Sequence, residues 1–204
     1  MNRGAMTKPF RFFVATLALT LGACNPASPD QSPIIGTSLE GSGIGGPFSL
    51  VDKAGKQVSW DQFKGKYRIV YFGYTFCPDA CPLDVGVMMQ GYLKYAKDHP
   101  GLAQEIQPIF ITIDPARDTP ARIGEFTAAF SPRLLGLTGT QAEVDAAIKA
   151  FKVLAARGKD TPGGYLMDHT RFAYLMDRDG KAIELLPVDK GPDAVAADLA
   201  ASVK

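Results

Sequence analysis

Two uninterrupted apolar runs lie along the chain and predict buried strands. They are residues 67–74 (YRIVYFGY) and 106–113 (IQPIFITI), both rich in β-branched and aromatic side chains. Such runs are typical of strands covered on both faces of a sheet, whereas half-exposed strands alternate apolar and polar positions. Between the runs, apolar residues recur at helical spacing until Pro100-Gly101 ends the pattern: Val85, Met88, Met89, Tyr92, Tyr95 and Ala96. We therefore expect a strand, a helix and a second strand in succession.

Three more helices are marked by their start signals. Thr119-Pro120 places a capping threonine before a proline at the first helical position, where proline costs no hydrogen bond. Residues 140–143 (TQAE) form a capping box and predict a helix to about Lys152. Gly191-Pro192 opens a terminal amphipathic helix, and residues 134–138 are expected to form a short strand between the first two of these helices.

Turn signals predict two hairpins. Residues 48–51 and 56–58 flank the turn DKAG, and residues 172–176 and 182–186 flank the turn DRDG. The order of elements predicts an α/β domain with a central mixed sheet flanked by helices and an N-terminal hairpin. This order fits the thioredoxin-like architecture.

The N-terminal segment has the layout of a secretory signal. Three cations (Arg3, Lys8 and Arg11) precede the apolar run FFVATLALTL, which ends in the small residues LGAC. A retained transmembrane anchor is the competing interpretation, but the apolar run from 10 to 23 is shorter than the roughly 20 residues of a spanning helix. An unmodified secreted protein is a third possibility. We interpret residues 1–23 as a signal peptide.

Residues 21–24 (LGAC) resemble the lipobox of bacterial lipoproteins, in which the cysteine carries the lipid and begins the mature chain. The resemblance implies lipidation of Cys24 and a protein anchored on the periplasmic side of a bacterial membrane. Residues 24–46 are rich in Pro, Ser and Gly and contain little apolar material, so we expect a flexible tether. The folded domain is then expected to occupy residues 47–204.

Composition and charge restrict the class of partner. The chain has 204 residues, 46% of them hydrophobic, and a formal net charge of +1. Removing the three cations before Cys24 leaves a slight excess of acidic side chains. A weakly acidic domain gives no electrostatic reason to expect nucleic acid as a partner.

The candidate chemistry lies where the first buried strand ends, in the stretch YFGYTFCPDACP. Cys77 and Cys81 are each followed by proline. Pro82 fits the first position of a helix, so we expect the helix to begin there with Cys81 as its cap. A helix N-terminus favours negative charge and makes a thiol easier to ionise. Loops after parallel strands are also where α/β sheets hold their sites.

Several functions are compatible with two thiols at this spacing. A structural disulfide would close a very small loop and stabilise the fold little. A redox dithiol is a second possibility, although thioredoxins have two residues between their cysteines and this chain has three. The third possibility is a site for a soft metal such as Cu(I) or Zn(II), completed by another donor. A peroxiredoxin-like peroxidase is disfavoured, because the threonine precedes Cys77 by two positions rather than three.

The chain has two histidines that could complete a metal site. His99 lies at a helix C-terminus, where a cation simply complements the helix dipole. His169 lies in GGYLMDHT, just before the strand expected at 172–176. A lone histidine usually packs in a core or faces solvent, but a flexible Gly-rich loop can carry this one over the mouth of the sheet. Asp168 is a candidate to orient its ring.

Three blocks carry a resemblance to a known family: FCPDACP at 76–82, DPARDTP at 114–120 and YLMDHT at 165–170. They resemble the signature blocks of the Sco/SenC family, and the similarity covers the domain from about Pro47. The resemblance implies a thioredoxin fold and, by position, a copper site formed by Cys77, Cys81 and His169. Phe76 departs from the family, which commonly has histidine there. The DPARDTP block has no ligand role and is expected to shape a loop or a partner surface.

The resemblance also implies a function. Family members are membrane-tethered copper proteins that assist assembly of the dinuclear copper centre of cytochrome c oxidase. We therefore expect a metallochaperone that binds Cu(I) and Cu(II), receives copper from a donor and passes it to the copper-accepting oxidase subunit. A redox-active pair, Cys77 and Cys81, also permits an alternative, a thiol–disulfide oxidoreductase that keeps client cysteines reduced.

Overall fold

The central strands lie where the apolar runs predicted them. The computed structural model describes Met1 and residues 34–204. In it, β4 (Tyr67–Gly73) and β5 (Ile106–Thr112) are adjacent and parallel, with Tyr67 opposite Ile106. Every residue of β4 is buried, as a strand covered on both faces requires. The prediction of two buried central strands is confirmed.

These strands form the middle of a six-stranded mixed sheet with the order β1-β10-β9-β4-β5-β6. On one side, β6 (Leu135–Leu137) continues the parallel part. On the other side, β9 (Ala173–Met176) and β10 (Ala182–Leu186) form the predicted hairpin, and β9 pairs antiparallel with both β10 and β4. A parallel pair needs a crossover connection, and α1 (Ala80–Asp98) supplies it between β4 and β5.

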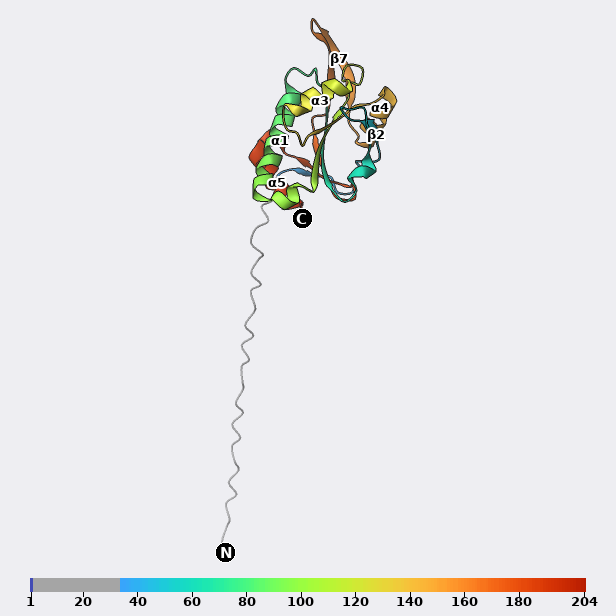
Figure 1. Cartoon of the computed structure of the whole chain (residues 1–204). Helices are drawn as coiled ribbons and strands as arrows, with labels where there is room; N and C mark the ends of the chain where they lie inside the picture. The colour runs from blue at the N-terminus through green and yellow to red at the C-terminus, as the bar shows by residue number, and fades with distance from the viewer. Residues whose placement is uncertain (2–33) are drawn as a thin grey trace. The chain divides into compact units, whose positions relative to one another are not determined.

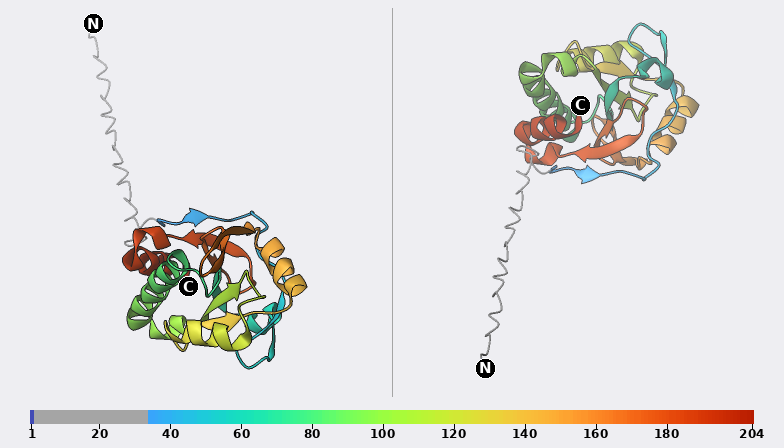
Figure 2. Two further views of the ribbon diagram at one scale, coloured as in Figure 1. Left: turned by 90° about the horizontal axis from the view of Figure 1, so that it is seen from above. Right: turned by 90° about the horizontal axis from the view of Figure 1, so that it is seen from below.

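Helices cover both faces of the sheet. Figures 1 and 2 show α1 beside α5 (Pro192–Ser202) on one face, and α4 (Gln141–Ala150) on the other. The remaining elements are β2 (Ser49–Val51) and β3 (Gln57–Ser59), which form the N-terminal hairpin, and η1 (Trp60–Phe63), α2 (Pro100–Ala103), α3 (Pro120–Ala128) and η2 (Val188–Lys190). The α/β class, the mixed sheet and the N-terminal hairpin are confirmed.

Two helix starts follow the predicted chemistry. The Thr140 side chain accepts a hydrogen bond from the Glu143 backbone N–H, and the Glu143 carboxylate accepts one from Thr140 in return. Thr119 accepts from the backbone N–H of Arg122, with Pro120 at the first position of α3. Both caps satisfy backbone donors that a helix start leaves unpaired.

The segment before Pro47 differs from the expected flexible tether. β1 (Thr37–Ser38) pairs with β10 at the sheet edge, and the Leu39 N–H donates to the Ile183 carbonyl at 2.9 Å. The structure therefore places residues 37–46 with the domain, whereas the composition assigned them to the tether. Edge pairing uses backbone groups, so it needs none of the apolar side chains whose scarcity suggested a tether. Residues 2–23 of the predicted signal peptide lie outside the described residues, and so does Cys24.

A second difference concerns the segment before β9. The expected Gly-rich loop is a hairpin of β7 (Ala155–Thr161) and β8 (Gly164–His169), which projects from the domain in Figure 1. β7 has the sequence AARGKDT and is mostly exposed. Its only β-branched residue is Thr161, and it lacks the alternation of apolar and polar positions that indicates a strand. Among the helices of residues 34–204, none is long and apolar enough to cross a bilayer.

Candidate metal centre

The loop after β4 carries the first cysteine and the following helix carries the second. Cys77 lies in the loop, and α1 begins at Ala80 with Asp79 as its cap. The prediction that Cys81 caps the helix is therefore wrong: Cys81 is the second helical residue. Pro82 is tolerated at the third, because the first turn has no intrahelical acceptors for its N–H groups. The cysteines nevertheless lie at a helix N-terminus, as expected.

The two sulfurs are adjacent and differ in exposure. The backbone N–H of Cys81 donates a hydrogen bond to Cys77 Sγ, with 3.3 Å between the nitrogen and the sulfur. Cys77 is half-buried, Cys81 is fully buried, and both are free thiols in the structure. Gly73, the last residue of β4, leaves room for the inner sulfur, since a Cβ there would lie 3.1 Å from Cys81 Sγ.

His169 joins this pair from a distant part of the chain. It is the last residue of β8, and its Nε2 lies 3.3 Å from Cys81 Sγ. The other ring nitrogen, Nδ1, lies 2.8 Å from the Thr170 carbonyl oxygen. The rings of Tyr71 and Tyr74 meet the imidazole edge-on, with centroids 6.4 and 6.0 Å away. The structure thus brings together the three residues that the sequence blocks suggested.

The other two residues considered lie apart from this contact. Asp168 is exposed, and its carboxylate lies against Gly158, where a Cβ would be 3.0 Å from Oδ2. It does not orient the ring, because Nδ1 contacts the Thr170 carbonyl instead. His99 ends α1 and stacks on Tyr95 at 4.7 Å, consistent with the structural role expected for it.

Hydrogen bonding makes the two thiols unequal acids. The Cys81 thiol donates to Cys77, and this bond, with further ones from His169 and from backbone N–H groups, holds the pKa of Cys77 well below the usual thiol range. The same bond and burial raise the pKa of Cys81. Hydrogen-bond donors stabilise the thiolate of Cys77 and so lower its pKa. The same thiolate disfavours a second negative charge beside it, so the Cys81 thiol keeps its proton more tightly. The arrangement therefore favours ionisation of Cys77, the more exposed sulfur, over ionisation of Cys81.

The DPARDTP block holds this loop and the hairpin in place. The buried carboxylate of Asp118 accepts from the Thr75 backbone N–H at 3.0 Å and the Thr75 hydroxyl at 2.6 Å, which fixes the turn before Cys77. Burial raises the pKa of Asp118. Arg117 pairs with Asp114 and donates to the Tyr165 carbonyl of β8 at 2.8 Å. The block thus shapes the loop, one of the two roles considered for it.

The two sulfurs and the imidazole are donors that suit a soft metal ion, but they do not yet form a complete metal-binding arrangement. Thiolates favour Cu(I), and an added imidazole suits Cu(II). No group of three or more His, Cys, Asp and Glu side chains in residues 34–204 already stands in a metal-binding arrangement. Cys77, Cys81 and His169 therefore lie close together without forming a complete metal-binding arrangement.

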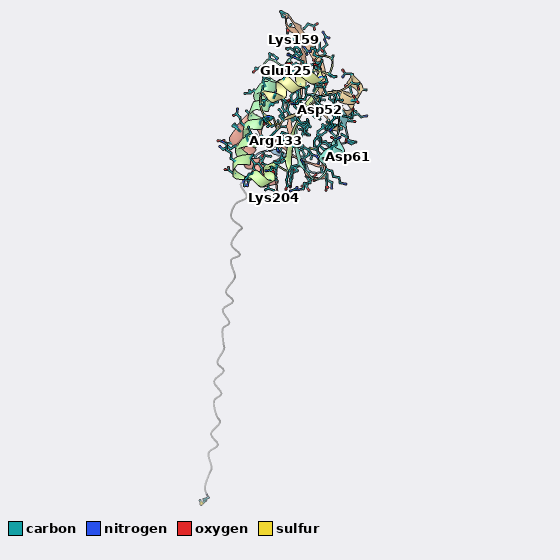
Figure 3. The ribbon with its side chains drawn as sticks, viewed as in Figure 1. Asp52, Asp61, Glu125, Arg133, Lys159 and Lys204 are labelled. Carbon is teal, nitrogen blue, oxygen red and sulfur yellow. The ribbon has the colours of Figure 1, made fainter. Side chains whose placement is uncertain are left out.

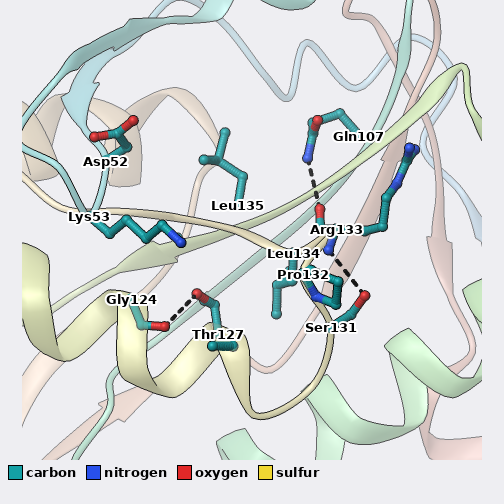
Figure 4. A pocket seen from close by; sticks show the side chains of 12 residues that line it. Asp52, Lys53, Gln107, Gly124, Thr127, Ser131, Pro132, Arg133, Leu134 and Leu135 are labelled. Atoms are coloured by element: carbon teal, nitrogen blue, oxygen red, sulfur yellow. Dashed lines mark hydrogen bonds between the residues drawn. The ribbon is translucent and has the colours of Figure 1, made fainter.

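A pocket elsewhere on the domain has different chemistry. About 400 Å³ in volume, it lies beside α3 and β6, with Lys53 and Thr127 among its lining residues (Figure 4). Neither cysteine nor histidine lines it. Figure 3 shows Lys159, on β7, at the opposite end of the domain from Lys204. Cys77, Cys81 and His169 thus lie away from this pocket, at the end of β4, between the cysteine loop and β8.

The fold and the site define a class of protein: a thioredoxin-like domain with a dithiol and an imidazole at the carboxyl end of its central strand. The family model described as SCO1/SenC matches residues 36–204. A SCO2-like protein of Rickettsia felis is 38% identical over 154 residues, which cover 74% of this chain and 73% of the relative. The chain belongs to the SCO1/SenC family.

Solved structures agree. Bradyrhizobium japonicum ScoI with copper bound is 41% identical, with a TM-score of 0.69, and the match covers 77% of this chain and 98% of that one. BsSco, described as a member of the Sco family of cytochrome c oxidase assembly proteins with a disulfide switch, is 25% identical, with a TM-score of 0.55. That match covers 82% of this chain and 96% of BsSco.

Proposed function

We propose that this protein is a copper metallochaperone that assists assembly of the dinuclear copper centre of cytochrome c oxidase. In this proposal Cys77, Cys81 and His169 hold the copper. The observation that carries it is the 3.3 Å approach of His169 Nε2 to Cys81 Sγ, beside a second sulfur. Support also comes from the ScoI relative with copper bound and from BsSco, described as belonging to an oxidase assembly family.

In this proposal, Cys77, Cys81 and His169 have different roles because thiolates and imidazole favour different copper oxidation states. Copper is the cargo, received from a donor and released to the copper-accepting oxidase subunit. Soft thiolates at Cys77 and Cys81 can hold Cu(I) in a two-coordinate site, whereas Cu(II) prefers more ligands and a nitrogen donor, which His169 supplies. The half-exposed Cys77 is the sulfur that an incoming donor or acceptor meets first. Binding should weaken as pH falls, because the donors must be deprotonated.

Copper titration of two histidine variants tests the donor set. His169→Ala should keep the fold and some Cu(I) affinity while losing most Cu(II) binding and the thiolate-to-copper absorption band. His99→Ala is the matched control and should change neither, because its ring stacks on Tyr95 at the far end of α1. A His169→Ala protein with the wild-type Cu(II) spectrum and affinity would remove His169 from the site.

A second candidate, a thiol–disulfide oxidoreductase, is favoured by the low pKa of Cys77. The Cys77 thiolate would attack a client disulfide, forming a mixed disulfide and releasing one client thiolate. Cys81 would then lose its proton and displace the second client thiolate, leaving a Cys77–Cys81 disulfide and a reduced client. Client reduction by metal-free protein, followed by thiol counting, tests this. Only the dithiol form should bind Cu(I), because a disulfide sulfur is a poor ligand.

We further propose that the domain is held at the periplasmic face of a bacterial membrane by lipid on Cys24, after removal of residues 1–23. The basic, apolar and small-residue segments before Cys24 support this. Mass spectrometry of membrane-extracted protein should find a mature chain that begins with lipid-modified Cys24. A chain that retains Phe12 and Phe13, or an unmodified Cys24, would refute the anchor without affecting the copper site.

A further inference from the structure

One buried carboxylate connects the segments that carry the proposed copper donors. Asp84 lies on α1, one turn after Cys81, and its side chain is only 7% exposed. Its Oδ2 accepts a hydrogen bond from the Tyr71 hydroxyl at 2.9 Å. Tyr71 belongs to β4, the strand that leads into the loop of Cys77. The carboxylate therefore already joins the two segments that carry the sulfurs.

Arg171 connects the third segment to the same carboxylate. It lies two residues after His169, between β8 and β9, and makes two bonds to Asp84. Nε lies 2.8 Å from Oδ2, and Nη2 lies 2.6 Å from Oδ1. A two-bond pair between arginine and carboxylate fixes orientation as well as distance. The chain just beyond the imidazole is thereby tied to the helix that carries Cys81.

This tie matters because the strand that carries His169 is not part of the central sheet. In residues 34–204, β8 pairs with β7 alone and forms no ladder with the six-stranded sheet. An isolated two-stranded hairpin is only marginally stable in water. The position of the imidazole at its end therefore depends on contacts outside the hairpin. Tyr71 contributes one, since its ring lies edge-on to His169.

We propose that Asp84 and Arg171 are positioning residues, whose ion pair holds the His169 imidazole over Cys81. Both carboxylate oxygens of Asp84 are already bonded to Tyr71 or Arg171, so the pair acts through His169 rather than as a copper ligand. The expected effect of this pair on copper affinity rests on the proposed function. Its effect on the position of the His169 ring does not depend on that function.

The copper experiment compares Arg171→Ala with a matched arginine variant in the full-length protein. Arg171→Ala should weaken Cu(II) binding about 10- to 100-fold, as loss of a ligand's supporting partner typically does, and should shift the thiolate-to-copper band. Cu(I) affinity should change far less, because two thiolates can hold that ion. Arg171→Lys should restore part of the Cu(II) affinity.

Arg122→Ala is the matched control. The Arg122 side chain is 49% exposed against 50% for Arg171, and it also pairs with a carboxylate, that of Glu125. It should leave both affinities unchanged, which separates positioning from a general loss of positive charge. In a His169→Ala background, Arg171→Ala should have no further effect on Cu(II) binding. An equal loss in both backgrounds would overturn the proposal.

A copper-free measurement keeps this test independent of the proposed function. In metal-free protein, NMR should detect contacts between the ring protons of Tyr71 and His169, and Arg171→Ala should lose them while Arg122→Ala keeps them. Because Arg171 is half-exposed, we expect its variants to fold, and Arg171→Gln provides a second variant with a neutral donor. If the wild type failed to bind copper, the proposed function would fail, but loss of these contacts would still support the positioning role. Unchanged contacts in Arg171→Ala would overturn it.

Discussion

The site at the end of β4 and the edge formed by β10 and α5 each hold two acidic groups close together, yet the pKa of Cys77 at the first is lowered while that of Glu184 at the second is raised. At the first, the thiol of Cys81 and backbone N–H groups donate to Cys77 and lower its pKa. At the second, burial raises the pKa of Glu184 to about 7. Glu184 is 1% exposed, and within residues 34–204 its Oε2 has no hydrogen-bond partner.

The supply of donors explains the difference. The first turn of α1 offers free backbone N–H groups to a sulfur. At the sheet edge, the backbone N–H groups of Ile35 and Gly36 donate to Asp198 at 2.9 and 2.6 Å. Glu184 is left with one hydroxyl, that of Ser202, at 2.8 Å. Burial alone therefore suppresses ionisation, and only burial with donors produces a reactive anion.

Replacing Glu184 gives the largest expected effect. Because its folded-state pKa lies above the ordinary value of 4.5, the folded protein binds more protons than the unfolded chain between about pH 4.5 and about pH 7. Its stabilising contribution is complete below that window and is lost as pH rises through it. Glu184→Gln should match the wild type at about pH 4 and exceed it by about 3 kcal/mol at about pH 8.

Urea unfolding at the two pH values measures this difference. Glu40→Gln, at an exposed glutamate, is the control and should show no such pH-dependent gain. A Glu184→Gln protein whose stability tracks the wild type at both pH values would show that Glu184 does not retain its proton.

Removing the donor at the dithiol should make the two regions more alike. Cys81→Ala deletes the thiol that stabilises the Cys77 anion, and a hydrogen bond to a charged group contributes about 1.5–3 kcal/mol. The pKa of Cys77 should rise by about one to two units, so the midpoint of its alkylation rate plotted against pH should move up by the same amount. Alkylation rates followed by mass spectrometry at Cys77 measure this, with Cys77→Ala as the blank. An unchanged midpoint would assign the activation to the backbone donors alone.

The smallest effect concerns the single donor to Glu184. Ser202→Ala removes a bond that lowers the pKa of Glu184, so that pKa should rise further. The free energy of unfolding should fall by about 1 kcal/mol at about pH 8 and by less at about pH 5. The loss should shrink when Glu184 is already glutamine, because the two changes share one interaction. Equal losses with and without Glu184 would contradict the pairing.

The sequence by itself determined the elements whose causes are local. The buried strands β4 and β5 follow from unbroken apolar runs, and the starts of α3 and α4 follow from side chains that cap the neighbouring backbone. The spacing of Cys77 and Cys81 is also local, since they lie four positions apart at the end of a strand. Each of these features depends on groups within a few residues of one another, so spacing alone reveals it.

Only the tertiary structure decided the features that join distant segments. It turned the expected loop before β9 into a hairpin, paired residues 37–38 with β10 and set His169 against Cys81. It also replaced Asp168 with the Thr170 carbonyl beside the ring and revealed the bond between Asp84 and Arg171, 87 positions apart. In the sequence, Asp84 cannot be told from any other polar residue of a helix, and Arg171 cannot be told from any other exposed cation. Their pairing depends on how the sheet brings α1 and β8 together, a long-range packing result that local pattern does not encode.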